Sequence, residues 1–201
     1  MPLEPLRLPE PAEELPEEVE RLLGRWQEAE QEFRGRLTYQ PPGGFFPGDY
    51  SGAYAALRSI LESGLAPGKC FCEWGSGTGV ITLLAASLGF AAHGIEVQPE
   101  FVEFARSLET ADGAVFACGT FVPDGLASTL PRPDHPSFLD NDGEDGHVQL
   151  ELDPAHVDVV YCYPWPGDEQ AVDAVFEAIA REGALLLTDD GEGFQLKRKR
   201  S

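Results

Sequence analysis

The sequence predicts an α/β fold with a mostly parallel sheet and helices on both faces. Three observations support this prediction: short apolar segments alternate with amphipathic ones, a glycine-rich turn follows the first apolar segment, and 42% of the 201 residues are hydrophobic. Alternating strands and helices are typical of a parallel sheet with right-handed crossovers. A chain of this length is expected to form one domain with a real core.

The first 42 residues form a segment rich in Pro and Glu, followed by an amphipathic helix. Hydrophobic residues recur in it at helical spacing, at Val19, Leu22, Leu23, Trp26, Ala29 and Phe33. We expect this helix to pack outside the main sheet. The remaining residues, 43–201, are predicted to form the main domain. They begin with the turn-rich loop GGFFPGDYSG and a helix that ends near Gly64.

Alternation of strands and helices begins at residue 69. The predicted strands cover 69–74, 91–97, 114–119, 157–163 and 184–190, and the predicted helices cover 80–89, 99–109 and 169–183. Between the third and fourth strands lies an acidic insert, at about 120–156, which is either a functional cover with affinity for a cationic partner or a solvated loop. Within it, HVQLELD places apolar residues at every second position, which predicts a short strand.

Charge and composition exclude several classes of protein. The net charge of −21 disfavours a nucleic-acid partner, because such binding depends on Lys and Arg neutralising phosphates. The basic stretch KRKR, Lys197 to Arg200, is expected to be a solvated tail. No stretch has the length of a signal peptide or a membrane span, so we expect a soluble, cytoplasmic protein without a membrane partner. The sequence does not predict the oligomeric state.

Cysteine and histidine positions give no signal for a metal site. The four cysteines lie inside the apolar segments, which indicates small buried hydrophobes in a reducing compartment, and the four histidines are scattered singly. We therefore expect no bound metal.

The segment CEWGSGTGV carries the strongest functional signal. Gly75, Gly77 and Gly79 follow a predicted strand that ends in the acid Glu73, and a second acid, Glu96, ends the next strand. In the dinucleotide pattern G-x-G-x-x-G the third glycine would stand where Val80 is. An acid at the strand end suits a cofactor with a positive amino group better than a pyrophosphate, so a nicotinamide-dependent oxidoreductase is the weaker alternative.

The stretch from Phe71 to Arg106 resembles motif I through the second strand of class I, Rossmann-like S-adenosylmethionine-dependent methyltransferases. The resemblance implies S-adenosylmethionine as the cofactor, with Glu73 near its methionine ammonium and Glu96 on the ribose hydroxyls. Val97 would lie against the adenine. Backbone of the glycine turn would line the methionine and ribose; the turn residues proposed are Gly75, Ser76, Gly77 and Gly79.

The end of the third strand departs from the family pattern. The family commonly places an acid there for the adenine amino group, whereas this chain has Thr120. The resemblance then requires a backbone or hydroxyl contact from Gly119, Thr120 or Phe121 instead.

The loop before the second predicted helix resembles the segment that closes over the cofactor in some protein-lysine methyltransferases. On that basis Phe46, Asp49 and Tyr50 would face the methionine end, and the alternative is an aromatic loop that simply packs on the helices. A protein side chain such as lysine, or a small molecule, is the expected methyl acceptor.

The fourth predicted strand ends in YCYPWPGDE, where this family places residues that face the substrate. Tyr163 and Trp165 are the candidates for catalysis, because aromatic faces attract cations and can hold a methyl acceptor in line with a sulfonium. They could equally form a packed turn.

Few residues follow the last of the predicted parallel strands, 184–190. Only GEGFQLKRKRS follows Asp190, so the C-terminal hairpin is expected to be shortened or absent, with room for one strand at Phe194 to Lys197. The exposed edge of the sheet would need a cover. Because the C-terminus is shortened and the acid expected for the adenine is missing, a non-catalytic scaffold that keeps the fold is the alternative to an enzyme.

Overall fold

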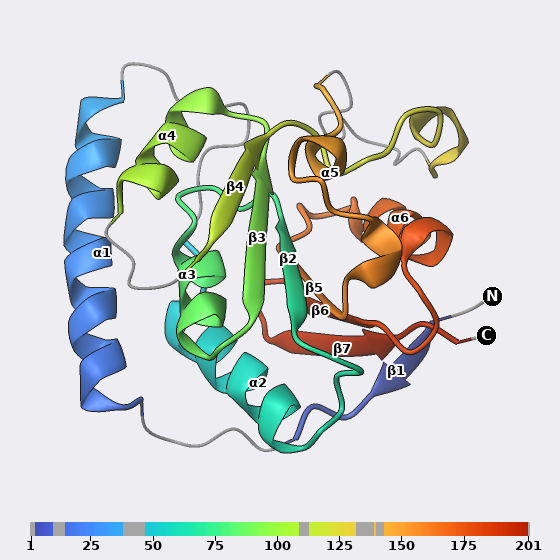
Figure 1. Ribbon diagram of the computed structural model, residues 1–201, viewed down its shortest axis with the longest axis horizontal. Helices are drawn as coiled ribbons and strands as arrows, with labels where there is room; N and C mark the ends of the chain where they lie inside the picture. Colours follow the sequence, from blue (N-terminus) through green and yellow to red (C-terminus); the bar gives the residue numbers. More distant parts are fainter. Residues whose placement is uncertain are drawn as a thin grey trace.

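The structure is a computed structural model that describes residues 3–9, 15–37, 47–108, 113–131, 139 and 143–200. These residues form one seven-stranded sheet of order β1-β7-β6-β5-β2-β3-β4. Five strands run parallel, at Cys70–Trp74 (β2), Ala91–Glu96 (β3), Val115–Cys118 (β4), Val159–Cys162 (β5) and Leu185–Asp189 (β6). The predicted α/β fold with a mostly parallel sheet is confirmed (Figure 1).

Helices cover both faces of the sheet, as the alternation predicted. One face carries α1 (Glu17–Arg36), α2 (Tyr50–Glu62), α3 (Val80–Ser87) and α4 (Pro99–Ser107), which share a buried cluster with Phe71, Val159 and Leu187 of the sheet. The opposite face carries α6 (Glu169–Ile179), which packs on Trp74, Val160 and Leu186. Figure 1 shows α6 on the other side of the sheet from α1.

The amphipathic helix predicted near the N-terminus is α1. Its apolar positions Val19, Leu23 and Trp26 are buried, and Phe33 stacks on Phe104 of α4 at a centroid distance of 4.4 Å. Because α1 packs over α3 and α4, it forms an outer layer on this face, as expected.

A short hairpin ends the chain. Strand β7 (Phe194–Arg198) returns antiparallel to β6, in agreement with the single C-terminal strand that the sequence allows. The edge beyond β7 is paired with β1 (Glu4–Leu6), which the sequence did not predict. This pairing satisfies β7 backbone groups that would otherwise form an open edge.

One predicted strand is wrong. The segment after residue 145 forms the short helix α5 (Gly146–Gln149), followed by a 3-10 turn at Pro154–His156, where HVQLELD predicted a strand. Asp145 causes the difference, because its carboxylate accepts hydrogen bonds from His147 N and Val148 N and so begins a helix. Leu150 and Leu152 still pack on the α6 face.

The cysteines lie on strands, as predicted. Cys72 and Cys162 are buried on β2 and β5, whereas Cys70 and Cys118 are half-buried. No helix of the described residues has the length and hydrophobicity needed to cross a membrane.

Candidate functional site

The turn between β2 and α3 depends on glycine. Gly75, Gly77 and Gly79 have φ angles of 72°, 51° and 80°, a region in which other residues are strained. A Cβ on Gly79 would lie 2.7 Å from Phe116, whereas a Cβ on Gly75 would meet no atom within 4 Å. The first glycine therefore presents bare backbone to open space, and the third packs tightly against β4.

Backbone hydrogen bonds attach this turn to β3. The N–H groups of Gly75 and Ser76 both donate to the carbonyl oxygen of Ile95, each at 2.9 Å. The Ser76 hydroxyl is buried and has no hydrogen-bond partner among the described residues. This hydroxyl lies 2.9 Å from where a Cβ on Gly94 of β3 would be, so a ligand lying along the turn would meet the open space at Gly75 and not the hydroxyl.

Glu96 ends β3 beside the turn. Its Oε2 accepts a hydrogen bond from Gly77 N at 2.8 Å, and its Oε1 accepts one from Gln98 N at 2.9 Å. The side chain is 8% exposed, and Val97, which follows it, is half-buried. The structure thus brings Glu96 and the glycine turn together, as the sequence predicted.

Glu73 points toward the first turn of α3. Its Oε2 accepts hydrogen bonds from Thr82 N at 2.8 Å and from Thr82 Oγ1 at 2.5 Å. Burial raises the pKa of Glu73 to about 8; the two Thr82 hydrogen bonds oppose this rise and the charge of Glu96 adds to it. An ammonium group placed beside Glu73 would lower the pKa of this carboxyl and so favour its charged form.

Glu30 of α1 joins the site, and the sequence analysis missed it. Its Oε1 accepts hydrogen bonds from the hydroxyl of Tyr50, at 2.6 Å, and from the hydroxyl of Thr78 in the glycine turn. Glu30 is 3% exposed. The signal was present, because position 30 continues the buried stripe of α1 four residues after Trp26.

Tyr50, a predicted cofactor residue, is therefore buried, and its hydroxyl donates a hydrogen bond to Glu30. Burial raises the pKa of its phenol, and the charge of Glu30 adds to the rise, so Tyr50 stays protonated and donates. Asp49 begins α2, because its carboxylate accepts a hydrogen bond from Gly52 N at 2.9 Å. Phe46 lies outside the described residues.

The end of β4 is connected to the insert. Thr120 N donates to Glu144 O, and the Thr120 hydroxyl accepts a hydrogen bond from Val122 N at 3.1 Å. Gly119 N donates to Glu96 O at 2.9 Å, and Phe121 stacks on Trp74 with a centroid distance of 4.9 Å. Thr120 is thus buried, and its hydroxyl already accepts a hydrogen bond from the backbone.

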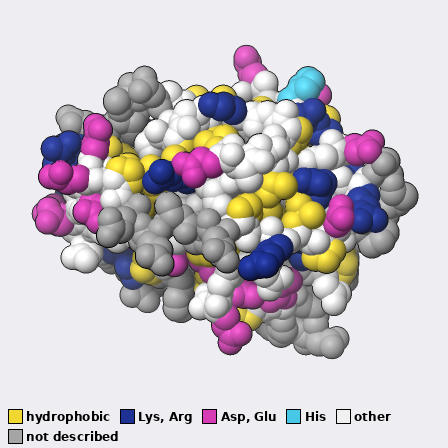
Figure 2. All heavy atoms as spheres, turned by 90° about the horizontal axis from the view of Figure 1, so that it is seen from below, with side chains coloured by type: hydrophobic (Ala, Val, Ile, Leu, Met, Phe, Trp, Pro, Cys, Tyr) yellow, Lys and Arg dark blue, Asp and Glu magenta, His cyan; other side chains and the backbone are white. Residues whose placement is uncertain are grey.

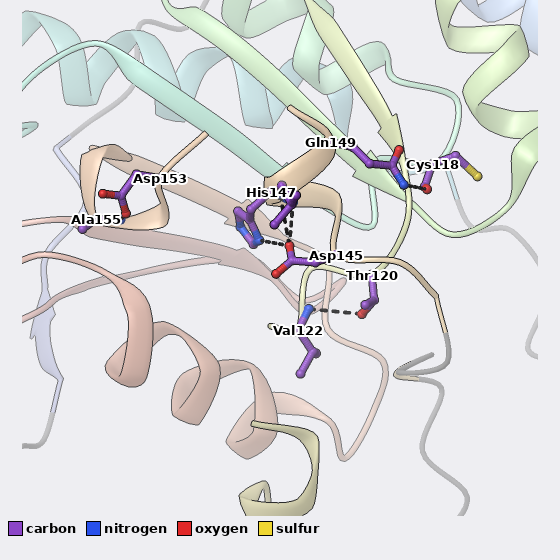
Figure 3. A network of polar contacts seen from close by, with 9 residues as sticks. Cys118, Thr120, Val122, Asp145, His147, Gln149, Asp153 and Ala155 are labelled. Atoms are coloured by element: carbon purple, nitrogen blue, oxygen red, sulfur yellow. Dashed lines mark hydrogen bonds and ion pairs between the residues drawn. The ribbon is translucent and has the colours of Figure 1, made fainter. Parts of the chain in front are cut away.

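The insert brings an acid to the strand end that lacks one. Glu144 Oε2 accepts a hydrogen bond from Gln149 Nε2 at 3.1 Å. The same nitrogen donates to Cys118 O at 2.7 Å, a bond that Figure 3 shows. Glu144 is exposed, and its charge helps to raise the pKa of the Cys118 thiol, after burial and Glu96. An exposed carboxylate therefore lies near the end of β4, although it comes from a distant part of the chain.

Tyr163 and Trp165 follow β5 and face each other edge to face, with ring centroids 6.5 Å apart. Both are half-buried, and the Tyr163 hydroxyl lies 3.3 Å from where a Cβ on Gly191 would be. The two candidates for catalysis thus lie together near the turn between β6 and β7.

Tyr161 is a second residue that the sequence analysis missed. It is registered with Glu73 across β5 and β2, so the two side chains share the α3 face of the sheet. Its hydroxyl is buried without a hydrogen-bond partner among the described residues. Burial raises the pKa of this phenol, and the charge of Asp189, itself buried on β6, adds to the rise. No sequence motif marks Tyr161, since it lies within an apolar strand.

Comparisons with known proteins support the fold. No family model matches the chain, and no curated protein matches it by sequence. Cofactor-bound Rv0187 from MTB is similar in structure, with a TM-score of 0.52 and 18% identity over 84% of this chain and 65% of that chain. The present chain thus spans about two thirds of the length of that neighbour.

Two further structures align less well. An RNA methyltransferase from Salinibacter ruber in complex with S-adenosyl-L-homocysteine has a TM-score of 0.45 and 20% identity, over 70% of this chain and 85% of that chain. Magnesium protoporphyrin IX methyltransferase from Synechocystis PCC 6803 with bound SAM has a TM-score of 0.44 and 13% identity, over 88% and 77%. At 18% identity, the likeness to cofactor-bound Rv0187 concerns the fold alone, which is a Rossmann-like α/β fold with a mostly parallel sheet.

Proposed function

We propose that the protein binds S-adenosylmethionine at the glycine turn and transfers its methyl group to an acceptor. The observation that carries the proposal is the pairing of a left-handed glycine turn with Glu96, whose carboxylate lies at the turn within hydrogen-bond distance of Gly77 N. The predicted domain at residues 43–201 would hold the cofactor, and α1 of the preceding segment would support it through Glu30.

The residues present fit the cofactor chemically. Gly75 offers an open approach to backbone, and Glu96 can accept hydrogen bonds from a pair of ribose hydroxyls. Glu73 supplies a carboxyl for a positive amino group. The remaining proposed contacts are Tyr50, Gly77, Gly79, Val97, Gly119, Thr120 and Phe121.

Glu144 is an additional candidate for the adenine end. The Thr120 hydroxyl already accepts a hydrogen bond from backbone, so it is a poor replacement for the acid that the family pattern expects. The exposed carboxylate of Glu144 is bridged to the end of β4 through Gln149 and can accept a hydrogen bond from an amino group.

When bound, S-adenosylmethionine supplies an electrophilic methyl group on a positively charged sulfur. The chain then has to position an acceptor and exclude water, and much of the rate can come from such positioning. Tyr163 and Trp165 are the proposed substrate-facing residues, because their aromatic rings can hold a cationic or apolar acceptor.

The acceptor class is a protein side chain such as lysine, or a small molecule. A net charge of −21 favours a cationic acceptor over a polyanion. Figure 2 shows one face of the molecule on which Lys and Arg side chains are scattered among acidic and apolar ones. A lysine acceptor would lose its proton before attack, and the proton would pass to water or to a nearby carboxylate.

A non-catalytic scaffold is the second candidate. The observation that favours it is at the end of β4, where Thr120 stands in place of the acid expected to bind the adenine amino group. The Thr120 hydroxyl already accepts a hydrogen bond from Val122 N. Such a protein would bind the cofactor and retain its methyl group with every acceptor offered.

Titration calorimetry with S-adenosylmethionine, S-adenosylhomocysteine and NAD tests the cofactor proposal. We expect micromolar binding of the first two, weakened roughly 10- to 100-fold in Glu96→Ala, because hydrogen bonds to a charged group are lost. Glu103→Ala, an exposed change on α4, is the matched control and should bind like the wild type. A folded wild-type protein that binds neither sulfur compound would refute the proposal.

Transfer is tested separately with S-adenosylmethionine that carries a labelled methyl group. Proteins and small amines are offered as acceptors, and label recovered on an acceptor would establish an enzyme. Cofactor binding without transfer to any acceptor would favour the scaffold.

A further inference from the structure

A buried carboxylate on α1 contacts the glycine turn. Among the described residues of α1, the buried ones are Val19, Leu23, Trp26 and Glu30, so the stripe is apolar except at Glu30. Burying a carboxyl group costs free energy unless hydrogen bonds satisfy it. An apolar residue would pack at position 30 without that cost. The role of Glu30 therefore lies in its hydrogen bonds and not in packing.

These hydrogen bonds come from two different elements. Glu30 Oε1 accepts one from the hydroxyl of Tyr50, the first residue of α2, at 2.6 Å, and one from the hydroxyl of Thr78 in the glycine turn. Glu30 is 3% exposed and Thr78 is 1% exposed. Hydrogen bonds to a carboxylate are among the strong ones, and exclusion of water strengthens them. Glu30 thus connects α1 firmly to the turn.

Two carboxylates hold adjacent residues of this turn. Glu96 of β3 accepts a hydrogen bond from Gly77 N at 2.8 Å, and Glu30 of α1 accepts one from the hydroxyl of Thr78. Gly77 and Gly79, on either side of Thr78, have left-handed φ angles of 51° and 80°. Glycine populates many conformations, so the flanking glycines do not fix this geometry by themselves. Contacts from outside the turn have to do so.

The position of α1 makes this contact separable from the sheet. Helix α1 lies outside α3 and α4 and forms no part of the sheet (Figure 1). Outer elements can open at a lower free energy than the central strands of a domain. Loosening of α1 would then release the hydroxyl of Thr78 while the sheet stays folded.

We propose that Glu30 is a positioning residue through which α1 holds the glycine turn in the conformation that binds the cofactor. Docking of α1 and binding of the cofactor then favour each other, because coupling between two sites is reciprocal. The proposal rests on the proposed function, since it takes the glycine turn as the S-adenosylmethionine site. It adds a means of regulation, because any partner that displaces α1 would lower the affinity for the cofactor.

Two substitutions of Thr78 test the effect on affinity. Thr78→Val keeps the shape of the side chain and removes the hydroxyl, whereas Thr78→Ser keeps the hydroxyl; Thr78 is not among the proposed cofactor contacts. In titration calorimetry with S-adenosylhomocysteine, we expect Thr78→Val to weaken binding roughly 5- to 20-fold and Thr78→Ser to stay within about twofold of the wild type. A merely structural role would lower stability and leave the affinity of the folded protein unchanged. Equal affinities of the two variants would overturn the proposal.

Hydrogen exchange tests the contact without any cofactor. Gly77 N and Gly79 N both donate hydrogen bonds, to Glu96 Oε2 and to Ser76 O, so the exchange of these two amides reports the geometry of the turn. We expect Glu30→Gln to speed their exchange about threefold to tenfold, because a neutral amide oxygen is a weaker acceptor than a carboxylate. The amides of β6 should be unaffected.

Glu32→Gln is the matched control, because Glu32 is exposed on the same helix. It should leave the exchange of the turn amides as in the wild type. Equal exchange of these amides in Glu30→Gln and Glu32→Gln, or an equal increase in β6 and in the turn, would contradict a positioning role.

The outcomes separate this inference from the proposed function. A wild-type protein that binds S-adenosylhomocysteine should also show slower exchange of the α1 amides when the ligand is bound, and this slowing should be lost in Thr78→Val. Binding without such slowing overturns the inference alone. A folded wild-type protein that does not bind refutes the proposed function, and with it the link to the cofactor. The exchange of the free protein then still decides whether α1 holds the turn.

Discussion

The raised pKa of Glu73 predicts a specific loss of stability as the pH rises. Burial raises this pKa from 4.5 to about 8, so the folded protein prefers the protonated carboxyl and the unfolded chain releases its proton first. The stability is therefore full below about pH 4.5, and it decreases as the pH rises toward 8. Above pH 8 the loss is constant.

The size of this loss follows from the pKa difference. Each pKa unit corresponds to about 1.4 kcal/mol, so the total loss is about 5 kcal/mol, of which about half falls between pH 5 and pH 7. Glu73→Gln removes the titration and keeps an oxygen that can accept a hydrogen bond from Thr82. Subtracting the stability of this variant from that of the wild type cancels the contributions of other titrating groups.

Urea denaturation at several pH values from 5 to 8 measures the difference. The unfolding free energy of the wild type should fall relative to that of Glu73→Gln by about 2–3 kcal/mol between pH 5 and pH 7. Glu103→Gln should follow the wild type. A difference that stays constant within about 0.5 kcal/mol over this range would show that Glu73 is not a desolvated acid, and the argument from burial would fail.

Three further changes have expected outcomes. Gly79→Ala should lower the unfolding free energy by about 2–4 kcal/mol in urea denaturation, because the new Cβ clashes with Phe116 at a left-handed position; an effect below about 1 kcal/mol would contradict this. Glu30→Gln should cost about 1–3 kcal/mol, whereas Glu32→Gln, exposed on the same helix, should cost less than about 0.5; equal costs would exclude the buried hydrogen bonds as the cause. Deleting the residues of β1 should open the β7 edge and cause self-association, seen by light scattering, and a monomer of unchanged stability would argue against its covering role.

Periodicity and turn chemistry predicted most of the sheet. The alternation from residue 69 onward gave the parallel strands, because each is a continuous apolar run bounded by turn residues. Strand β1 was missed, because Glu4–Leu6 has three residues and carries no periodic signal. It is defined by its pairing with β7, at the other end of the chain, which no local pattern can reveal.

Local hydrogen bonding and burial explain the other differences. The period-two pattern around Val148 predicted a strand, but the Asp145 carboxylate caps a helix there. In the site, the glycines and Glu96 were visible as a motif, whereas Tyr161 carried no signal and Glu30 was marked only by its position in the buried stripe of α1. Their roles depend on which elements pack together, and a charged residue on a helix is ordinarily assigned to its solvated face.

Pairing of β1 with β7 also determines how the protein resists force. The two strands are antiparallel and Glu4 is opposite Arg198, so the chain enters and leaves the sheet at the same end of this pair (Figure 1). A force applied to the two termini therefore breaks the backbone hydrogen bonds between β1 and β7 one after another, starting at Glu4 and Arg198, and does not act on all of them at once. The outermost strand is thus the part of the sheet that tension would detach first, ahead of the parallel strands that hold the glycine turn.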